Sequence, residues 1–435
     1  MPSLARALYS TLIYLAQPLL RYKLRRRAVA EPGYGLAVEE RFGHYGNHHS
    51  AATPEQDAKA GWIWIHAVSL GETRAAAILL TALRQQRPHL RLLLTHSTAT
   101  GRTEGQKLLQ PGDRQVWLPW DTPGAVQRFL RRFRPMLGIL LETEIWPNLI
   151  AMCQQHHVPL VLANARLNEK SYQQARRLGW LARPAYAGLT AVYAQSDADA
   201  KRLCALGAPV QGVFGNLKFD AIPDAAQITQ GRLWRSHINK PVLLLASSRE
   251  GEEELWLQAW QTWAAQAQTH RNVQWLIVPR HPQRFDAVAT VLEQAGLRVS
   301  RRSQWKDYPE PADVWIGDTI GEMAFYYSLA TVALLGGSFA PLGGQNLIEA
   351  VACGCPLVLG PHTFNFAEAA TLALRQEVAR PAADMAQAIA IAETWIQEGA
   401  LLEKAQAAAL LLSQEHRGAA QATATAVESV LSKVG

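Results

Sequence analysis

The sequence has few cysteines and lacks the residue clusters that hold metal ions. It contains four cysteines in 435 residues, and none of them are spaced as CxxC. Four are too few for a disulfide framework in a chain of this length, so a reducing compartment is expected. Cys353 and Cys355 are too close together for a zinc knuckle, which favours a structural role. No cluster of Asp, His or Cys has metal-ligand spacing, so we expect no metal ion.

Two common nucleotide-binding fingerprints are also missing. The chain has neither a GxGxxG pattern nor a Walker loop, GxxxxGK followed by Ser or Thr. Their absence argues against a dehydrogenase and against a P-loop ATPase. The composition is that of a globular protein, with 49% hydrophobic and 18% charged residues, and the length suits two or three domains.

Acidic residues are absent from the first 30 positions. The formal net charge is +7, and six basic residues lie in this segment, so the rest of the chain is nearly neutral. A nucleic-acid binder usually spreads its basic residues over a face, so no nucleic acid partner is expected. Here the basic residues adjoin an apolar segment, which points to anionic lipid instead.

That apolar segment, Leu4 to Leu20, is shorter than the roughly 20 apolar residues of a transmembrane helix. It can span the bilayer or lie in one leaflet. A cleaved signal peptide is disfavoured, because Arg25–Arg27 follow the apolar residues instead of preceding them. An amphipathic helix of a soluble protein is a further alternative. We interpret residues 1–30 as a membrane anchor with a basic flank in the cell inner membrane, with the catalytic domains on the cytoplasmic face.

From Gly61 onward, short apolar runs alternate with helix-length segments. This alternation predicts an α/β fold with two doubly wound, Rossmann-like domains of parallel strands that face a central cleft. The expected strands are Trp62–His66, Arg91–Thr95, Leu137–Leu141, Leu160–Ala163, Ala191–Ala194, Val242–Ala246, Gln274–Val278, Val314–Ile316, Val332–Leu335 and Leu357–Leu359.

A pause in the alternation after Phe214 sets the expected domains at residues 31–220 and 221–435. Residues 383–432 are rich in Ala and Leu and are predicted to be helical, and the terminal helix is a candidate to pack back on the first domain. Ligands of such sheets bind at the carboxyl ends of the strands, so residues that follow strands are the candidates for function.

The first candidate follows the first expected strand, in the string HAVSLGE. Gly71 allows a tight turn, and Glu72 would then lie at the ligand-binding edge as a general base. The alternative is a capping box, in which Ser69 and Glu72 only begin a helix.

The string ETEIWPN follows the third expected strand. On an extended chain Glu142 and Glu144 would point the same way, and Pro147 could begin the next helix. A solvated pair of acids at a strand end and an acceptor-binding role both remain open.

Three loops follow strands of the second domain. PRHPQRF supplies Arg280, His281 and Arg284 as donors to a phosphate, or is a surface turn. GDTIGE offers backbone amides, and its Glu322 could meet a base or ribose. GGSFAPLGGQN, continuing LIEA, places two glycine pairs before a helix, where amides can bind an anion. Glu349 would lie one helical turn from Asn346, on the same face, where its carboxylate could hold the two ribose hydroxyls. A structural glycine turn is the alternative for this last loop.

Together these strings resemble a known family. The ordered motifs are HAVSLGE, THSTATG, ETEIWPN, NARL, AQSDADA, GNLKFD, PRHPQRF, GDTIGE, GGSFAPLGGQN and GPHTFNF, from about Gly61 to beyond Phe366. They resemble the 3-deoxy-D-manno-octulosonic acid (Kdo) transferases of lipopolysaccharide core synthesis. The resemblance implies a GT-B fold, a CMP-Kdo donor bound by the C-terminal domain, and a lipid A precursor (lipid IVA) as acceptor on the N-terminal domain.

The resemblance also implies roles for single residues. Glu72 is expected to be essential and Glu142 to matter for catalysis. The nucleotide contacts it implies are Pro279, Arg280, Ile320, Gly321, Glu322, Asn346, Leu347, Ile348 and Glu349. Gln345 and Leu347 stand where the family usually has His and Pro, and Arg249 also replaces a His, which leaves the details of donor contact open.

The mechanism that follows is inverting and needs no cofactor and no metal. Glu72 would take the proton of the acceptor's 6′-hydroxyl, whose oxygen attacks the anomeric carbon opposite CMP, while Arg280 and loop amides near Gly343–Asn346 stabilise the leaving phosphate. The alternative function is that of another GT-B enzyme, a UDP-sugar transferase or an epimerase. A non-enzymatic basic protein of the membrane surface is a third. The number of Kdo residues transferred stays open.

Overall fold

The computed structural model describes residues 4–46, 61–266, 272–306 and 308–433. The chain divides into two compact units, residues 1–220 with 417–435, and residues 221–416. Each unit is built on a seven-stranded sheet whose paired strands all run parallel.

The first unit contains a long N-terminal helix and the first sheet. Its helices are α1 (Leu4–Ala30), α3 (Leu70–Gln86), α4 (Ala99–Gln106), α5 (Pro123–Phe133), α6 (Pro147–Gln155), α7 (Glu169–Arg177), α8 (Gly179–Ala187), α9 (Asp197–Ala205) and α18 (Ala419–Leu431), with 3-10 turns η1 (Pro32–Gly35), η2 (Val38–Phe42) and η4 (Leu217–Asp220). Its strands are β1 (Trp62–His66), β2 (Arg91–His96), β3 (Arg114–Trp117), β4 (Leu137–Leu141), β5 (Leu160–Ala165), β6 (Ala191–Ala194) and β7 (Val210–Val213), in the order β3-β2-β1-β4-β5-β6-β7.

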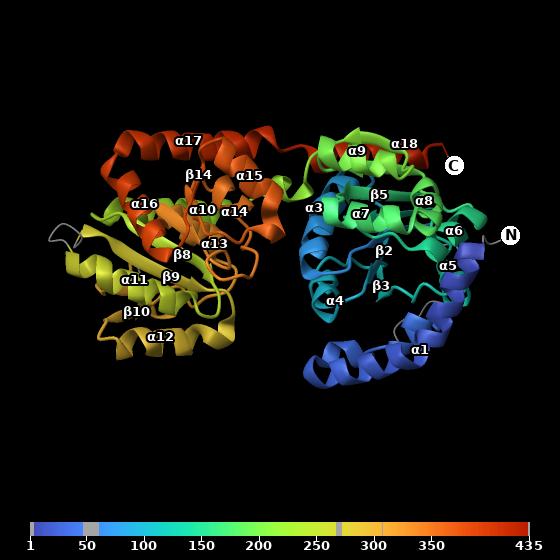
Figure 1. Cartoon of the computed structure of the whole chain (residues 1–435), viewed down its shortest axis with the longest axis horizontal. Coiled ribbons are helices and arrows are strands. Elements are labelled where there is room, and N and C mark those ends of the chain that lie inside the picture. Colours follow the sequence, from blue (N-terminus) through green and yellow to red (C-terminus); the bar gives the residue numbers. More distant parts are fainter. Residues whose placement is uncertain (1–3, 47–60, 267–271, 307, 434–435) are drawn as a thin grey trace. The chain divides into compact units, whose positions relative to one another are not determined.

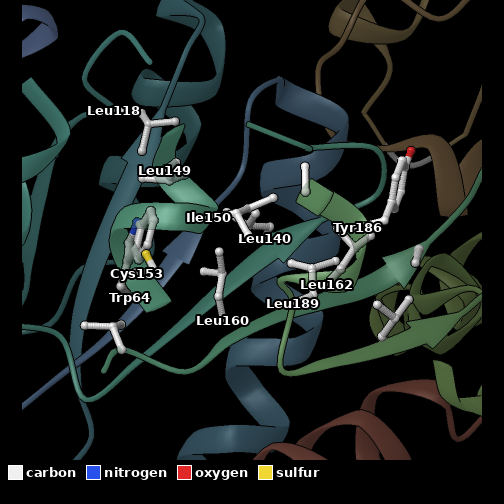
Figure 2. Packing of buried hydrophobic residues seen from close by; sticks show 14 of the residues in the cluster. Trp64, Leu118, Leu140, Leu149, Ile150, Cys153, Leu160, Leu162, Tyr186 and Leu189 are labelled. Atoms are coloured by element: carbon white, nitrogen blue, oxygen red, sulfur yellow. The ribbon is translucent and has the colours of Figure 1, made fainter. Parts of the chain in front are cut away.

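Both faces of this sheet are covered, which is why its central strands are apolar at successive positions. Side chains alternate along β1, so that Ile63 and Ile65 pack with α3 and α18, whereas Trp62 and Trp64 pack with α5 and α6. Figure 2 shows the second of these cores, where Trp64 lies beside Cys153 of α6.

The second unit repeats the architecture. Its strands are β8 (Val242–Ser248), β9 (Gln274–Pro279), β10 (Val299–Arg301), β11 (Val314–Ile316), β12 (Val332–Leu335), β13 (Leu357–Leu359) and β14 (Ala379–Pro381), in the order β10-β11-β9-β8-β12-β13-β14. Its helices are α10 (Ala225–His237), α11 (Glu252–Gln266), α12 (Phe285–Gln294), α13 (Met323–Leu329), α14 (Ile348–Ala352), α15 (Ala367–Arg375), α16 (Met385–Gln397) and α17 (Gly399–Glu415), with short 3-10 turns η6 (Pro282–Arg284), η7 (Arg302–Gln304) and η8 (Phe364–Phe366).

The prediction of two parallel-sheet α/β domains is confirmed. Every expected strand is present, and β3, β7, β10 and β14 are additional. These four are the edge strands of the two sheets. The prediction that residues 383–432 are helical is confirmed, since the segment forms α16, α17 and α18, with breaks at Glu398 and Gly418. Gly418 has φ 106° and is the N-cap of α18, so the chain turns there into the last helix.

Helix α18 returns to the first unit, where it packs along α3 (Figure 1). Asp220 accepts hydrogen bonds from the backbone N–H groups of Gly418 and Ala420, each at 2.5 Å, so it caps α18. Residues of α18 therefore belong to the hydrophobic core over β1 and α3.

Helix α1 lies against the first unit through polar contacts. Tyr9 donates to Asp121 at 2.9 Å, Ser10 donates to Asn148 at 3.1 Å, and the hydroxyl of Tyr14 accepts from the N–H of Gly124 at 3.0 Å. Among the helices of the described residues, none, α1 included, has both the length and the apolar character needed to cross a bilayer.

Candidate functional site

Glu72 lies in the first turn of α3, directly after β1. The hydroxyl of Ser69 accepts from the backbone N–H of Glu72 at 3.3 Å and donates to its Oε1 at 3.0 Å, while Oε2 accepts from the N–H of Val68 at 2.9 Å. The capping arrangement is therefore real, and it fixes the carboxylate in one orientation at the carboxyl end of β1.

The environment of Glu72 makes its carboxyl group a suitable base. The pKa of Glu72 is raised to about 7. Burial is the main cause, and the charges of Glu142 and Glu144 also raise the pKa, whereas the hydrogen bond from Val68 lowers it. A general base works best when its pKa is close to the operating pH. The capping and catalytic interpretations are compatible, because both oxygens keep lone pairs beyond those used in capping.

Glu142 follows β4 and holds an unusual backbone conformation. Its φ is 59°, in the left-handed region that costs a residue with a Cβ about 1–2 kcal/mol. Its buried side chain lies 3.0 Å from Nζ of Lys218 and 3.2 Å from Nε of Arg166. The site thus holds a carboxylate between two cations, at a strained position of a kind that is common at functional sites.

The extended chain on which Glu142 and Glu144 would point the same way is absent, because β4 ends at Leu141 and Glu142 has a left-handed conformation. Glu144 instead accepts from the indole N–H of Trp146 at 2.7 Å, and its Oε2 lies 3.8 Å from Nε2 of His66. His66 is fully buried, and burial lowers its pKa to about 3, so the ring is neutral. Among the described residues, this Nε2 has no hydrogen-bond partner.

The strand order explains why these groups gather. Strands β1 and β4 are neighbours, and the chain order of the strands reverses between them. Loops after such a pair leave a crevice at the carboxyl edge of the sheet, where ligands of doubly wound folds bind. No role was predicted for Lys218, Arg166 or His66, although each lies in one of the quoted strings, GNLKFD, NARL and HAVSLGE.

In the second unit the reversal falls between β8 and β12. Pro279 ends β9, next to β8, and the N–H of Arg280 donates to the carbonyl of Ser248 at 2.9 Å. Burial and then the charges of Arg249 and Arg280 lower the pKa of His281. The PRHPQRF turn therefore forms an electropositive edge, as a phosphate site requires.

The GDTIGE loop follows β11 and begins α13. Ile320 is 78% exposed and Gly321 has φ 84°, so this turn presents backbone to solvent. Glu322 accepts from Arg302 at 2.8 Å and from the hydroxyl of Thr319. Its carboxylate is thus held by the protein, and the exposed backbone beside it is the part of this loop that is open to a ligand.

The glycine-rich loop follows β12 and leads into α14. The N–H groups of Gly344 and Gln345 donate back to Gly337 and Gly336, at 2.7 and 3.0 Å, so the two glycine pairs hydrogen-bond each other. Those two amides are used inside the loop, so they are not among the amides near Gly343–Asn346 that a phosphate could take.

The expectation that Asn346 and Glu349 share a helical face is wrong, because α14 begins only at Ile348. Asn346 precedes the helix, and its side-chain oxygen accepts from the N–H of Ile348 at 3.2 Å. Leu347 and Ile348 have buried side chains, so only their backbone could meet a nucleotide. Glu349 lies in the first turn of α14.

Within the described ranges, no group of three or more His, Cys, Asp or Glu side chains could hold a metal ion. The carboxyl edge of the first sheet offers carboxylates. The carboxyl edge of the second sheet offers cations and backbone amides. Such an arrangement can take a proton from one molecule and bind an anion of another.

The comparison with known proteins agrees with this chemistry. Residues 37–221 match the family model described as 3-Deoxy-D-manno-octulosonic-acid transferase (kdotransferase). A 3-deoxy-D-manno-octulosonic acid transferase of Bordetella pertussis is 43% identical over 98% of this chain and 100% of its own length. This chain belongs to the Kdo transferase family. A relative of the same description from Haemophilus influenzae is 33% identical over 83% of this chain and 84% of its own length.

Two solved structures share the fold of this Kdo transferase family member. An Anabaena HepE protein in complex with UDP is 14% identical, covers 85% of this chain and 100% of its own, and has a TM-score of 0.56. A UDP-GlcNAc 2-epimerase from Neisseria meningitidis has the same identity and TM-score and covers 85% of this chain and 99% of its own. At this identity the likeness shows the two-domain fold alone.

Proposed function

We propose that this glycosyltransferase moves Kdo from CMP-Kdo to a hydroxyl group of a lipid A precursor, in lipopolysaccharide core synthesis. Membership of the Kdo transferase family supports the sugar. The observation that supports the chemistry is the fixed carboxylate of Glu72, whose pKa is raised to about 7 at the switch point of the first sheet.

In the proposed reaction, Glu72 accepts the proton of the acceptor hydroxyl as its oxygen bonds to the anomeric carbon of Kdo. The bond between that carbon and the CMP phosphate oxygen breaks, and its electron pair leaves with CMP. Attack opposite the leaving group inverts the anomeric carbon. Lys218 and Arg166 hold the carboxylate of Glu142, whose charge is among the causes that raise the pKa of Glu72 and so favour its uptake of a proton.

Donor binding is assigned to the second unit. CMP-Kdo carries an anionic phosphate, and the turn at Arg280 and the backbone at Ile320–Gly321 and Asn346–Glu349 lie after strands close to the β8/β12 switch point. Arginines and backbone amides can stabilise the leaving phosphate without a metal ion. We therefore propose a metal-independent reaction.

The test is product analysis with purified protein, CMP-Kdo and a lipid A precursor. Mass spectrometry should show the acceptor increased by one or more Kdo residues, and the anomeric configuration of the product should be opposite to that of the donor. A parallel panel of UDP-sugars addresses the alternative of a UDP-sugar enzyme. Turnover of a UDP-sugar, with none of CMP-Kdo, would contradict the proposal.

We also propose that α1 lies on the cytoplasmic surface of the inner membrane. Leu4, Leu8, Leu12, Leu15 and Leu19 are all more than half exposed and recur every three or four residues, so they form one apolar stripe. Exposed basic residues follow the stripe, at positions 23, 25 and 26. An apolar face with adjoining positive charge suits the interface of an anionic bilayer.

Vesicle sedimentation tests this placement. Replacing Leu8 and Leu15 with Gln should release the protein from vesicles that contain anionic lipid. Leu411, which is 53% exposed on α17, provides the matched control, and Leu411→Gln should leave binding unchanged. Equal binding of all variants would place the membrane contact elsewhere.

A further inference from the structure

Two adjacent carboxylates are buried at the start of α11. Glu252 and Glu253 are 0% and 1% exposed, although they follow an exposed turn at Gly251. Glutamates are almost never fully buried unless their charge is compensated. Each of these two has a different set of compensating partners, and each set belongs to a different loop.

Glu252 holds the glycine-rich loop that follows β12. Its Oε1 accepts from the backbone N–H groups of Phe339 at 3.0 Å and Ala340 at 3.2 Å. Its Oε2 accepts from those of Gly337 at 2.6 Å and Arg249 at 2.8 Å. One carboxylate therefore binds four amides, three of them from this loop. These amides are directed at protein, which leaves the later part of the loop for a ligand.

Glu253 holds the arginine-rich turn that follows β9. Both guanidinium nitrogens of Arg284 donate to it, at 2.9 Å each, and the hydroxyl of Ser248 donates at 2.6 Å. A bidentate pair of this kind fixes the plane of the guanidinium group as well as its distance. Arg284 lies one turn after Arg280, so the pair fixes the turn that carries Arg280.

The order of the strands explains how Glu252 and Glu253, which are adjacent in the sequence, contact two different loops. Strand β8 leads into α11 and lies between β9 and β12. Successive residues of a helix are about 100° apart around its axis, so Glu252 and Glu253 diverge. One reaches the loop after β12, and the other reaches the turn after β9.

We propose that Glu252 and Glu253 are positioning residues that set the two donor-binding loops of the second unit. They act through Gly337–Ala340 and Arg284 and do not touch the donor. The inference rests on the proposed function in one respect, namely that these loops take the CMP part of the donor.

Titration calorimetry with CMP and the full-length protein tests the inference. Glu252→Gln puts an NH2 donor among four N–H donors, and Glu253→Gln removes the charge that orients Arg284. Each should weaken CMP binding at least about tenfold and raise the KM for CMP-Kdo more than it lowers kcat. Glu254, exposed on the same turn, is the matched control. Glu254→Gln removes a charge near Arg284 without removing a contact, and should bind CMP within twofold of wild type.

The outcomes separate this inference from the proposed function. If wild type does not bind CMP, the donor assignment fails and the inference fails with it. If wild type binds CMP and both variants bind within twofold of it, the inference alone is overturned. If Glu252→Gln does not fold, Arg284→Lys provides the measurement, since lysine keeps the charge but cannot make the bidentate pair. That variant should also bind CMP about tenfold more weakly, and unchanged binding would overturn the inference.

Discussion

Substitution of Glu72 by Gln is the sharpest test of the proposed chemistry. Glutamine has the same shape and keeps an oxygen that can accept from Val68, so α3 should still begin at the same residue. The variant loses the base and its charge. Since general base catalysis typically contributes about 10²–10⁴-fold, we expect kcat to fall by at least about 100-fold with CMP binding unchanged.

The pH dependence gives an independent measurement of the same group. Burial, together with Glu142 and Glu144, raises the pKa of Glu72 to about 7, and only the deprotonated carboxylate can accept the proton. The value of kcat/KM should therefore rise with pH and level off above about 7, with about a tenth of the plateau remaining one pH unit below the pKa. The residual activity of Glu72→Gln should lack this acid limb.

Rising pH should lower the stability of the folded protein while it raises kcat/KM. The pKa of Glu72 in the folded protein lies above its ordinary value of 4.5, so its contribution to stability is present below about 4.5 and is lost as pH rises through about 7. Glutamine does not ionise. The Tm of wild type should therefore fall relative to that of the variant between pH 4.5 and pH 8, in the same thermal scans that check folding.

The control is Glu169→Gln, because Glu169 is an exposed carboxylate of the same unit. It should change neither kcat nor the pH profile. The general-base assignment is refuted if Glu72→Gln keeps more than about a tenth of the wild-type rate, or if the acid limb survives in the variant. A variant that simply unfolds would show that capping is the larger role of Glu72.

Further predictions address the surroundings of the base, the metal and the terminal helix. Lys218→Gln should lower the Tm and kcat, because it removes one of the two cations beside the buried Glu142, a loss of about 1–3 kcal/mol; an unchanged Tm and rate would contradict this. EDTA should leave turnover unchanged, and inhibition that magnesium reverses would show a metal-dependent reaction. Val427→Asp should lower the Tm strongly and cause aggregation, since it places a charge in the core between α18 and α3, whereas Lys433→Asp at the exposed end should be tolerated.

The central strands and the order of the motifs could be predicted from the sequence. Strands such as β4 and β8 are buried on both faces, so they appear in the sequence as apolar runs. The loops that carry the candidate site residues directly follow such strands. The edge strands β3, β7, β10 and β14 could not be predicted in this way. They are short and partly exposed, so apolar and polar residues mix in them without a clear run.

Local spacing predicted the capping pair of Ser69 and Glu72, whereas tertiary structure decided the long-range partners of the other site residues. Glu142 and Lys218 are 76 positions apart, and Glu252 reaches amides 85 to 88 positions away, because the parallel sheet order brings together loops that the sequence separates. Local spacing predicted that Glu142 and Glu144 point the same way on an extended chain, but the left-handed conformation of Glu142 ends that chain and the two carboxylates have different partners. The sequence determined which side chains are present at the strand ends, whereas the strand order and the turns determined which of them meet.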